Sequence, residues 1–160
     1  MLFTVADAEE AAFLAKKFPG SIFQELLLPH DSEITCGVFR SRNNDVSVIQ
    51  FHRVLSEGTT SWAKTVYNAD VERVCRLVAE RLNLIGSMNI QLRLTAFGPR
   101  VFEINPRFSS TIYMRHKLGF EDLVWSIKDS IGIEFRYPSI PLGIECVRTQ
   151  NAEVLGFYKK

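Results

Sequence analysis

Residues 88–108 read MNIQLRLTAFGPRVFEINPRF, and this stretch predicts its own structure clearly. Apolar and polar side chains alternate on both sides of TAFGP, residues 95–99. An alternation of period two that is interrupted by a turn predicts a β-hairpin. Successive side chains of a strand point to opposite faces, so the apolar ones should pack together against helices. That apolar face should comprise Ile90, Leu92, Leu94, Phe102 and Ile104.

The other face of this hairpin gathers polar side chains. With the turn centred near Phe97, Gln91 should lie across from Glu103, and Asn105 should share their face. Arg107 follows just past the strand end. One carboxylate and two amide oxygens suit a hard cation such as Mg²⁺ or Mn²⁺, and a guanidinium can hold a phosphate oxygen. The alternation alone leaves a second interpretation open, a solvated polar face of an edge hairpin.

Outward from the hairpin, hydrophobic periodicity and turn residues predict the remaining elements. Before it we expect a strand at 3–5, a helix that Asp7 caps over 7–18, a buried strand at 21–28, a hairpin of 33–40 with 46–54, a loop at 55–62 and a helix at 70–83. After it we expect a helix at 120–132 ending at Gly132, and a closing hairpin of 144–149 with 153–158. Strands joined mostly by hairpins predict an α+β domain, in which a largely antiparallel β-sheet is covered by helices on one face.

The composition excludes several classes of protein. The 160 residues carry a formal net charge of +1, which gives no indication of nucleic-acid binding. No apolar run approaches the roughly 20 residues of a membrane span, and the acidic N-terminus is unlike a signal peptide. The three cysteines, Cys36, Cys75 and Cys146, have no metal spacing and form no disulfide framework. We therefore expect a cytoplasmic protein with buried free thiols, no membrane and no nucleic-acid partner.

The hairpin sequence resembles the metal-binding hairpin of the ATP-grasp superfamily, nearest to the large subunit of carbamoyl phosphate synthetase and related carboxylate–amine ligases. The matching motifs are NIQ at 89–91 and EINPR at 103–107. The resemblance implies that Gln91, Glu103 and Asn105 coordinate a Mg²⁺ ion that bridges the ATP phosphates. It also implies that Arg107 contacts phosphate as a catalytic residue.

A second stretch, SIFQELLLPHDSEITCGVF at residues 21–39, is similar to the hinge strand of the same superfamily. A strand end presents free N–H and C=O groups to the adenine edge, and leucines supply apolar walls. Glu25 and Glu33 are eight residues apart where seven is usual, so either the intervening loop bulges by one residue or Glu33 is not the ribose ligand. The resemblance implies an adenine hinge of Gln24, Glu25, Leu26 and Leu27, with Glu33 at the ribose hydroxyls.

The segment FHRVLSEGTTSW, residues 51–62, occupies the place where relatives carry basic or histidine residues near the transferred phosphate. His52 and Arg53 are the candidate catalytic residues here. They fall on opposite faces of a regular strand, so at most one of them should face the site.

The resemblance covers residues 1–132 and implies one partial ATP-grasp domain. Residues 1–20 would be a remnant of the first lobe, 21–132 the nucleotide and metal lobe, and 133–160 the C-terminal strands. The lysine and glycine-rich loop of the first lobe are not found before residue 21. We therefore expect a fragment that is inactive or nearly so by itself, with an apolar surface that favours a homo-oligomer or a partner chain completing the site.

The function implied is ATP- and Mg²⁺-dependent ligation. A small-molecule carboxylate would be activated as an acylphosphate, and an amine or similar nucleophile would then displace the phosphate. The alternative is a non-catalytic nucleotide-binding, interaction or regulatory module that kept the fold. Retention of the whole Gln/Glu/Asn/Arg set favours the ligase.

Overall fold

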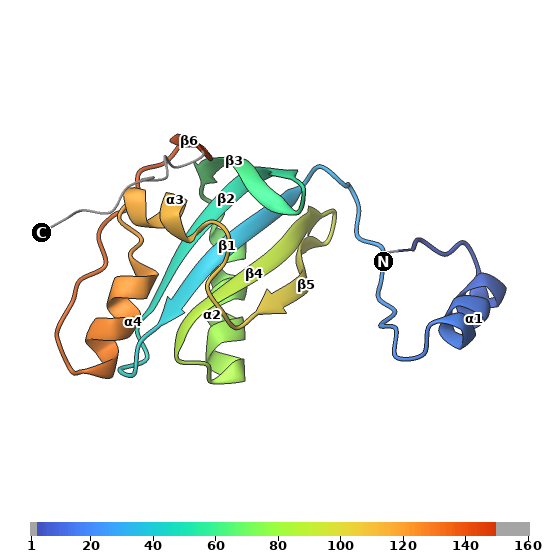
Figure 1. Cartoon of the computed structure of the whole chain (residues 1–160), viewed down its shortest axis with the longest axis horizontal. Helices are drawn as coiled ribbons and strands as arrows, with labels where there is room; N and C mark the ends of the chain where they lie inside the picture. Colours follow the sequence, from blue (N-terminus) through green and yellow to red (C-terminus); the bar gives the residue numbers. More distant parts are fainter. Residues whose placement is uncertain (1–2, 150–160) are drawn as a thin grey trace, which may run out of the picture.

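A computed structural model describes residues 3–149, and an antiparallel β-sheet forms its centre (Figure 1). Six strands in that part of the chain pair in the order β5-β4-β1-β2-β3-β6. The strands are β1 (Glu33–Arg40), β2 (Val46–Ser56), β3 (Thr59–Val66), β4 (Gly86–Thr95), β5 (Gly98–Asn105) and β6 (Glu145–Val147). The helices are α1 (Ala8–Lys17), α2 (Ala69–Leu82), α3 (Ile112–Lys117) and α4 (Asp122–Ser130). The expected fold class, α+β with a largely antiparallel sheet flanked by helices, is confirmed.

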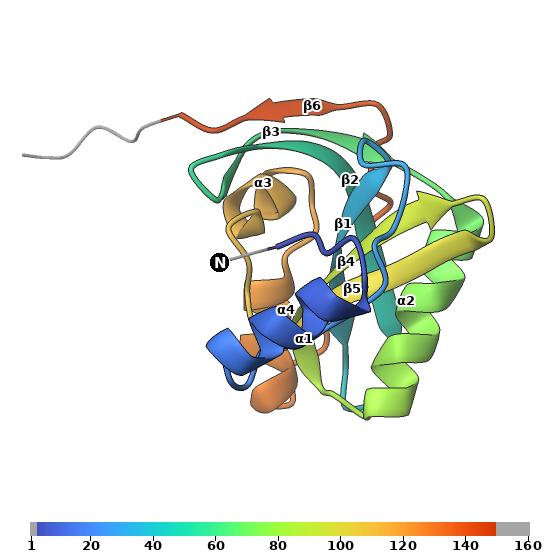
Figure 2. The ribbon, with the colours of Figure 1, turned by 90° about the vertical axis from the view of Figure 1, so that its right-hand side faces the viewer.

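Helices cover both faces of the sheet, whereas the sequence pattern predicted cover on one face only. Figure 2 shows α2 on one side of the sheet and α3 and α4 on the other. The reason lies in the central strand β1, where every residue from Ile34 to Arg40 is buried. A strand that buries side chains on both faces must be covered on both.

Two apolar clusters correspond to the two faces. The first packs α2 against the sheet and includes Ile34, Cys36, Val38, Val71, Cys75, Ala79, Met88, Ile90 and Leu92. The second packs α3 and α4 against the opposite face and includes Phe39, Ile49, Phe51, Ala63, Met114, Phe120 and Trp125. The Trp125 ring meets Phe120 edge-on at a centroid distance of 4.9 Å, which is a favourable aromatic geometry.

The expected helix at 70–83 is α2. Its N-cap Asn68 accepts hydrogen bonds from the backbone N–H groups of Asp70 and Val71 through its side-chain oxygen. The Gln50 side chain in turn bonds both backbone groups of Asn68, which ties the helix start to β2. Asn83 ends the helix at a φ of 50°, in the left-handed region that asparagine tolerates. An asparagine thus marks each end of this helix, through its side chain at the start and through its left-handed backbone at the end.

The β4–β5 hairpin has the register that the sequence predicted, with Gln91 opposite Glu103. One part of the prediction is wrong. The register shifts between Gln91 and Leu92, so Leu92 pairs with Val101. Val101 packs on the apolar cluster beneath α2, while Phe102 lies under the Arg93 guanidinium at 5.5 Å. A β-bulge at Phe102 therefore moves this side chain off the apolar face.

Two expected strands near the N-terminus are absent from the described residues. Residues 3–5 and 21–28 pair with no strand, and of the run 21–28 only Leu27 is buried. Figure 1 shows the chain that contains residues 21–28 running from α1 to β1 at the side of the sheet. An apolar run is buried as a strand only where another strand pairs with its backbone and other elements cover its side chains, and neither holds here.

The expected loop at 55–62 contains the end of β2, a tight turn and the start of β3. The turn residues Glu57 and Gly58 have φ angles of 50° and 77°. Positive φ at both positions is the geometry of a two-residue hairpin turn, so the Glu-Gly pair was the sequence feature that could have predicted this turn. The missed strand β3 then extends the sheet beyond β2.

The C-terminal expectations are met in part. The helix expected at 120–132 is α4, and Gly132, with a φ of 73°, follows its C-cap residue Ile131. The strand expected at 144–149 is β6, which pairs with β3. Its expected partner at 153–158 lies outside the described residues.

Two further expectations concern the cysteines and membrane helices. Cys36 and Cys75 are buried and Cys146 is half-buried, and all three are free thiols, as the cysteine pattern predicted. In the part of the chain between residues 3 and 149, no helix has the length and apolar character needed to cross a membrane. A cytoplasmic location stays a prediction, as does the expected division of the domain.

Candidate functional site

One face of β4 carries the polar side chains singled out above. Arg93, Gln91, Asn89 and Ser87 follow one another at alternate positions, on the side of the sheet where α3 and α4 lie. At about 3.4 Å per residue, the row spans roughly 20 Å along the strand. We call this row and the facing residues of β5 the polar face. The row runs along β4 from Arg93 at one end to Ser87 at the other.

The predicted metal ligands meet in the middle of the polar face. Gln91 lies opposite Glu103, and Asn89 lies opposite Asn105. The Asn105 side-chain N–H donates to Glu103 Oε1 at 2.7 Å. The three ligands expected from sequence are therefore neighbours, supplied by two adjacent strands.

Arg107 lies just beyond these ligands. Its Nη2 donates to Asn105 Oδ1 at 3.5 Å, and its Nη1 donates to the carbonyl of Phe108 at 3.0 Å. The side chain is exposed, and a guanidinium has five N–H donors, so donors are left for a phosphate oxygen. The arrangement matches the role predicted for Arg107, which no contact in the structure tests.

Arg53 is the basic residue of β2 that reaches the polar face. Its guanidinium donates to Glu33 Oε1 at 2.7 and 3.1 Å and to Gln91 Oε1 at 2.7 Å. His52 alternates to the opposite side of β2, and its Nδ1 lies 3.3 Å from the Glu33 carbonyl oxygen. The structure thus brings Arg53 and Glu33 to the predicted metal ligand Gln91, and it leaves His52 outside that network.

Arg93 holds the opposite end of the polar face, and the sequence did not mark it as a functional residue. Its Nη1 donates to the Leu27 carbonyl at 2.6 Å, and its Nη2 lies 3.9 Å from Glu33 Oε2. Arg93 lies two residues after Gln91, so the alternation of the strand could have predicted that it shares the polar face. Arg93 therefore ties the predicted adenine hinge to the predicted ribose ligand Glu33.

The rest of the predicted hinge is open. Gln24, Glu25 and Leu26 are exposed, and within the described residues their backbone N–H and C=O groups make no backbone hydrogen bond. Free backbone groups beside apolar side chains can pair with an adenine edge. The same stretch of chain exposes apolar side chains, with Ile22 90% and Leu26 52% exposed. An apolar surface was expected from the sequence, but self-association stays a prediction.

The donor set of the polar face fits a magnesium ion. A carboxylate and two amide oxygens are hard ligands, and an amide oxygen has two lone pairs, so Gln91 can accept from Arg53 and still coordinate. Among residues 3–149, no group of three or more His, Cys, Asp and Glu side chains is placed to hold a metal. A cation bound to the described residues of the polar face would therefore depend on the amides of Gln91 and Asn105.

A buried ion pair supports the polar face, and sequence reasoning missed it. Arg115 of α3 and Asp122 of α4 are excluded from solvent, and their Nη2 and Oδ2 atoms lie 3.0 Å apart. Ser87 of β4 donates to the same Asp122 oxygen at 2.5 Å. A Cβ on Gly37 would overlap Arg115 Nη1 and come within 2.6 Å of its Cδ, so only glycine leaves room for the side chain. Burial lowers the pKa of Arg115, and Asp122 opposes that shift.

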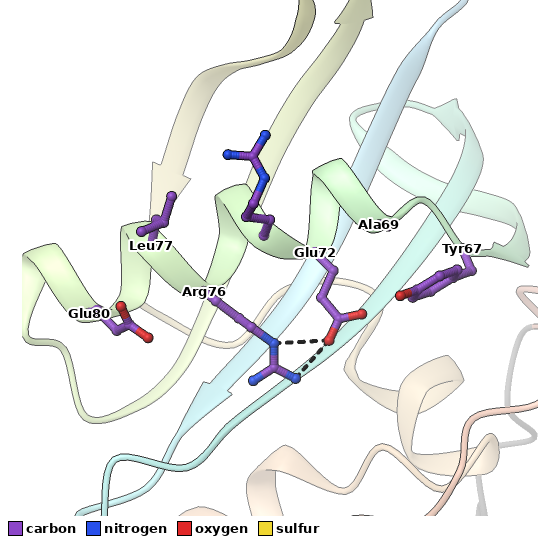
Figure 3. Close-up of a pocket in the computed structure, with 7 residues that line it drawn as sticks. Tyr67, Ala69, Glu72, Arg76, Leu77 and Glu80 are labelled. Carbon is purple, nitrogen blue, oxygen red and sulfur yellow. Dashed lines mark hydrogen bonds and ion pairs between the residues drawn. The ribbon is translucent and has the colours of Figure 1, made fainter.

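The hollows in the described part of the surface include one beside α4 and one beside α2. One, of about 340 Å³, adjoins Arg107 between the end of β5 and α4. We call it the α4 pocket, and its polar lining consists of Arg42, Ser87, Arg107, Ser126, Asp129 and Ser130. The other follows the solvent side of α2, where Figure 3 shows Glu72 bonded to Arg76 beside Tyr67. Of these two hollows, the α4 pocket is the one continuous with the polar face, since α2 covers the opposite face of the sheet.

Comparison with known proteins gives one family. The family described as "ATP-grasp in the biosynthetic pathway with Ter operon" matches residues 17–151, which is most of the chain. No curated protein matches the sequence.

Solved structures with a similar fold include three enzymes that are between 11% and 20% identical to this chain. The phosphoribosylaminoimidazole carboxylase ATPase subunit from Aquifex aeolicus is 20% identical, with a TM-score of 0.56 over 74% of this chain and 36% of that one. N5-carboxyaminoimidazole ribonucleotide synthetase from Thermus thermophilus is 17% identical, with a TM-score of 0.59 over 86% and 39%. The carboxyaminoimidazole ribonucleotide synthase from Aspergillus clavatus, complexed with ATP, is 11% identical, with a TM-score of 0.53 over 71% and 32%.

At these identities the likeness shows the fold alone. The chain spans between 32% and 39% of the length of these three structures. The closer resemblance to carbamoyl phosphate synthetase stays a prediction.

Proposed function

This chain belongs to the family described as "ATP-grasp in the biosynthetic pathway with Ter operon", and we propose that its polar face binds ATP and Mg²⁺ as part of a carboxylate–amine ligase. The observation that carries the proposal is the register of the β4–β5 hairpin. It sets Gln91 opposite Glu103 with Asn105 in contact, and Arg107 follows at once. A solvated strand at the edge of a sheet does not require a glutamine, a glutamate, an asparagine and an arginine at these positions.

ATP would lie along the polar face from the hinge to Arg107. The free backbone groups of residues 24–26 and the side chain of Leu27 would receive the adenine, and Glu33 the ribose hydroxyls. Arg53 and Arg93 hold the Glu33 carboxylate from two sides, which limits its rotamers before a ligand arrives. A preorganised carboxylate loses less conformational entropy on binding.

The phosphate end depends on Gln91, Glu103, Asn105 and Arg107. The first three would hold Mg²⁺, which would supply positive charge to neutralise the phosphates. Arg107 would hold an oxygen of the transferred phosphoryl group with its free donors. In the reaction, a carboxylate oxygen attacks the γ-phosphorus and ADP leaves. The amine then forms the C–N bond as phosphate departs with the electron pair of the broken C–O bond, and the nitrogen releases a proton.

Positioning and charge neutralisation account for most of the catalysis in phosphoryl transfer. Among the described residues, Arg107 would be the cationic contact to the phosphates, since Arg53 is already paired to Glu33 and Gln91. We therefore propose that residues 1–160 bind Mg·ATP weakly and turn it over slowly unless further groups, from this or another chain, complete the site.

Calorimetry tests the proposal directly. Mg·ADP is titrated into the 160-residue chain, and the titration is repeated with EDTA in excess. We expect binding that EDTA weakens and that Glu103→Ala abolishes, while Glu134→Ala, which removes an exposed glutamate far along the chain, leaves it unchanged. Absence of nucleotide binding would favour the alternative of an interaction module that kept only the fold.

A further inference from the structure

The α4 pocket lies next in line after the predicted phosphate contact. Ser87, the last residue of the polar row on β4, and Arg107 both line it. Along β4 the order is therefore hinge, ribose ligand, metal ligands and pocket. A molecule in this pocket would lie at the end of the site where a phosphoryl group is transferred.

The pocket lining includes two cationic side chains. Arg42 and Arg107 both line it, and Arg107 uses two of its five N–H donors within the chain. The Arg42 side chain is 60% exposed, and its Nε stands 3.9 Å from Asp129, beyond hydrogen-bond distance. Two guanidinium groups facing one hollow suit a planar carboxylate.

The same lining also includes hydrogen-bond acceptors, among them Asp129 beside Arg42. The Asp129 side chain is only 11% exposed, and it is held in place because both of its oxygens accept from the Arg42 backbone N–H, at 3.3 and 3.2 Å. The hydroxyl protons of Ser87, Ser126 and Ser130 are all used: they go to Asp122 Oδ2, to the Asp122 carbonyl and to the Ile127 carbonyl. These serines therefore present lone pairs to the pocket, and they can accept hydrogen bonds from a ligand.

We propose that the α4 pocket binds an amino acid in its zwitterionic form. Its carboxylate would lie against Arg42 and Arg107, and its ammonium group would face Asp129 and the serine hydroxyls. A simple dianion fits less well, since Asp129 would repel it. The hollow of about 340 Å³ has room for a side chain as well. The role of this amino acid as the attacking amine rests on the proposed ligase function, whereas its binding does not.

Nuclear magnetic resonance of the ¹⁵N-labelled 160-residue chain tests the inference with three probes. L-alanine carries both charges, propionate only the carboxylate and ethylamine only the ammonium group. We expect L-alanine to shift the amide signals of residues 42, 87 and 129, and to bind roughly tenfold more tightly than either single-charge probe, the size of one charge-assisted hydrogen bond.

Two variants and one control assign the contacts. Arg42→Gln should weaken L-alanine binding roughly tenfold. Arg73→Gln removes a similarly exposed arginine, 66% against 60%, from the opposite face of the sheet, and it should have no effect. Asp129→Asn keeps an oxygen for the Arg42 N–H but removes the charge, so it should weaken L-alanine binding and not weaken propionate binding.

The outcomes separate this inference from the proposed function. L-alanine binding no tighter than that of propionate or ethylamine, shifts confined to other residues, or equal binding by Arg42→Gln and Arg73→Gln would each overturn the inference. Mg·ADP affinity should be unchanged in Arg42→Gln. A chain that binds L-alanine in the pocket but does not bind Mg·ADP would retain this inference and overturn the ligase.

Discussion

Replacing Arg115 by methionine should lower the free energy of unfolding by about 3–5 kcal/mol, because it leaves Asp122 as an uncompensated buried charge. The two side chains are 0% and 1% exposed, so water cannot take the place of the guanidinium. Among the described side chains, Ser87 donates the one hydrogen bond to the Asp122 carboxylate, and Asp122 Oδ1 has no hydrogen-bond partner. Methionine is a flexible apolar side chain that can fill much of the vacated space, so lost charge should outweigh lost volume.

Urea unfolding followed by tryptophan fluorescence measures this loss, since Trp125 lies in the cluster that α3 and α4 form with the sheet. The second variant is Arg115→Met combined with Asp122→Asn, which removes both charges and keeps an acceptor for Ser87. The double variant should regain about 2 kcal/mol relative to Arg115→Met, because the unpaired charge is gone. A loss below about 1 kcal/mol in Arg115→Met, or strictly additive losses in the pair, would refute the reasoning.

Three further predictions follow from the same contacts. Gly37→Ala should cost about 1–3 kcal/mol in the urea assay, because its Cβ would overlap Arg115 Nη1; an unchanged unfolding midpoint would contradict this. Arg53→Met should weaken Mg·ADP binding in calorimetry by about tenfold, since it frees Glu33 and Gln91, whereas equal affinity would show that Arg53 does not position them. Burial, and after it the neighbouring Cys75, raises the pKa of the Cys36 thiol, so the folded state disfavours the thiolate. The protonated Cys36 thiol therefore contributes its full stability below the unfolded pKa near 9.0, and this contribution falls as the pH rises above that value. In urea midpoints measured from about pH 7 to about pH 10, Cys36→Ala should flatten this alkaline decline; parallel curves would contradict the assignment.

The local patterns of this sequence predict the β1–β2 hairpin, the β4–β5 hairpin and α2 well. The alternation in β4 and β5 and the asparagines that cap α2 act within a few residues, so they can be recognised without the rest of the fold. The opposition of Gln91 and Glu103 followed from the same alternation. The bulge at Phe102 could not be predicted in this way, because a single extra residue leaves the alternation of apolar and polar residues almost unchanged.

Long-range contacts explain what the sequence patterns missed. The sequence patterns assigned no role to Arg115, and only the meeting of α3, α4 and β1 shows that it is buried over Gly37. The apolar run at 21–28 has the composition of a buried strand, but burial depends on a partner that composition does not reveal. The choice between His52 and Arg53 also required the network, since alternation alone left both open.

The most direct test of the central claim locates the metal and nucleotide on the chain. Mn²⁺ can replace Mg²⁺ at oxygen ligands, and it broadens nearby nuclear magnetic resonance signals. When Mn·ADP is added to the ¹⁵N-labelled chain, the account predicts selective broadening at residues 89–91 and 103–107, with signals on the solvent side of α2 unaffected. Broadening along α2 instead, or no selective broadening at saturating Mn·ADP, would contradict the account.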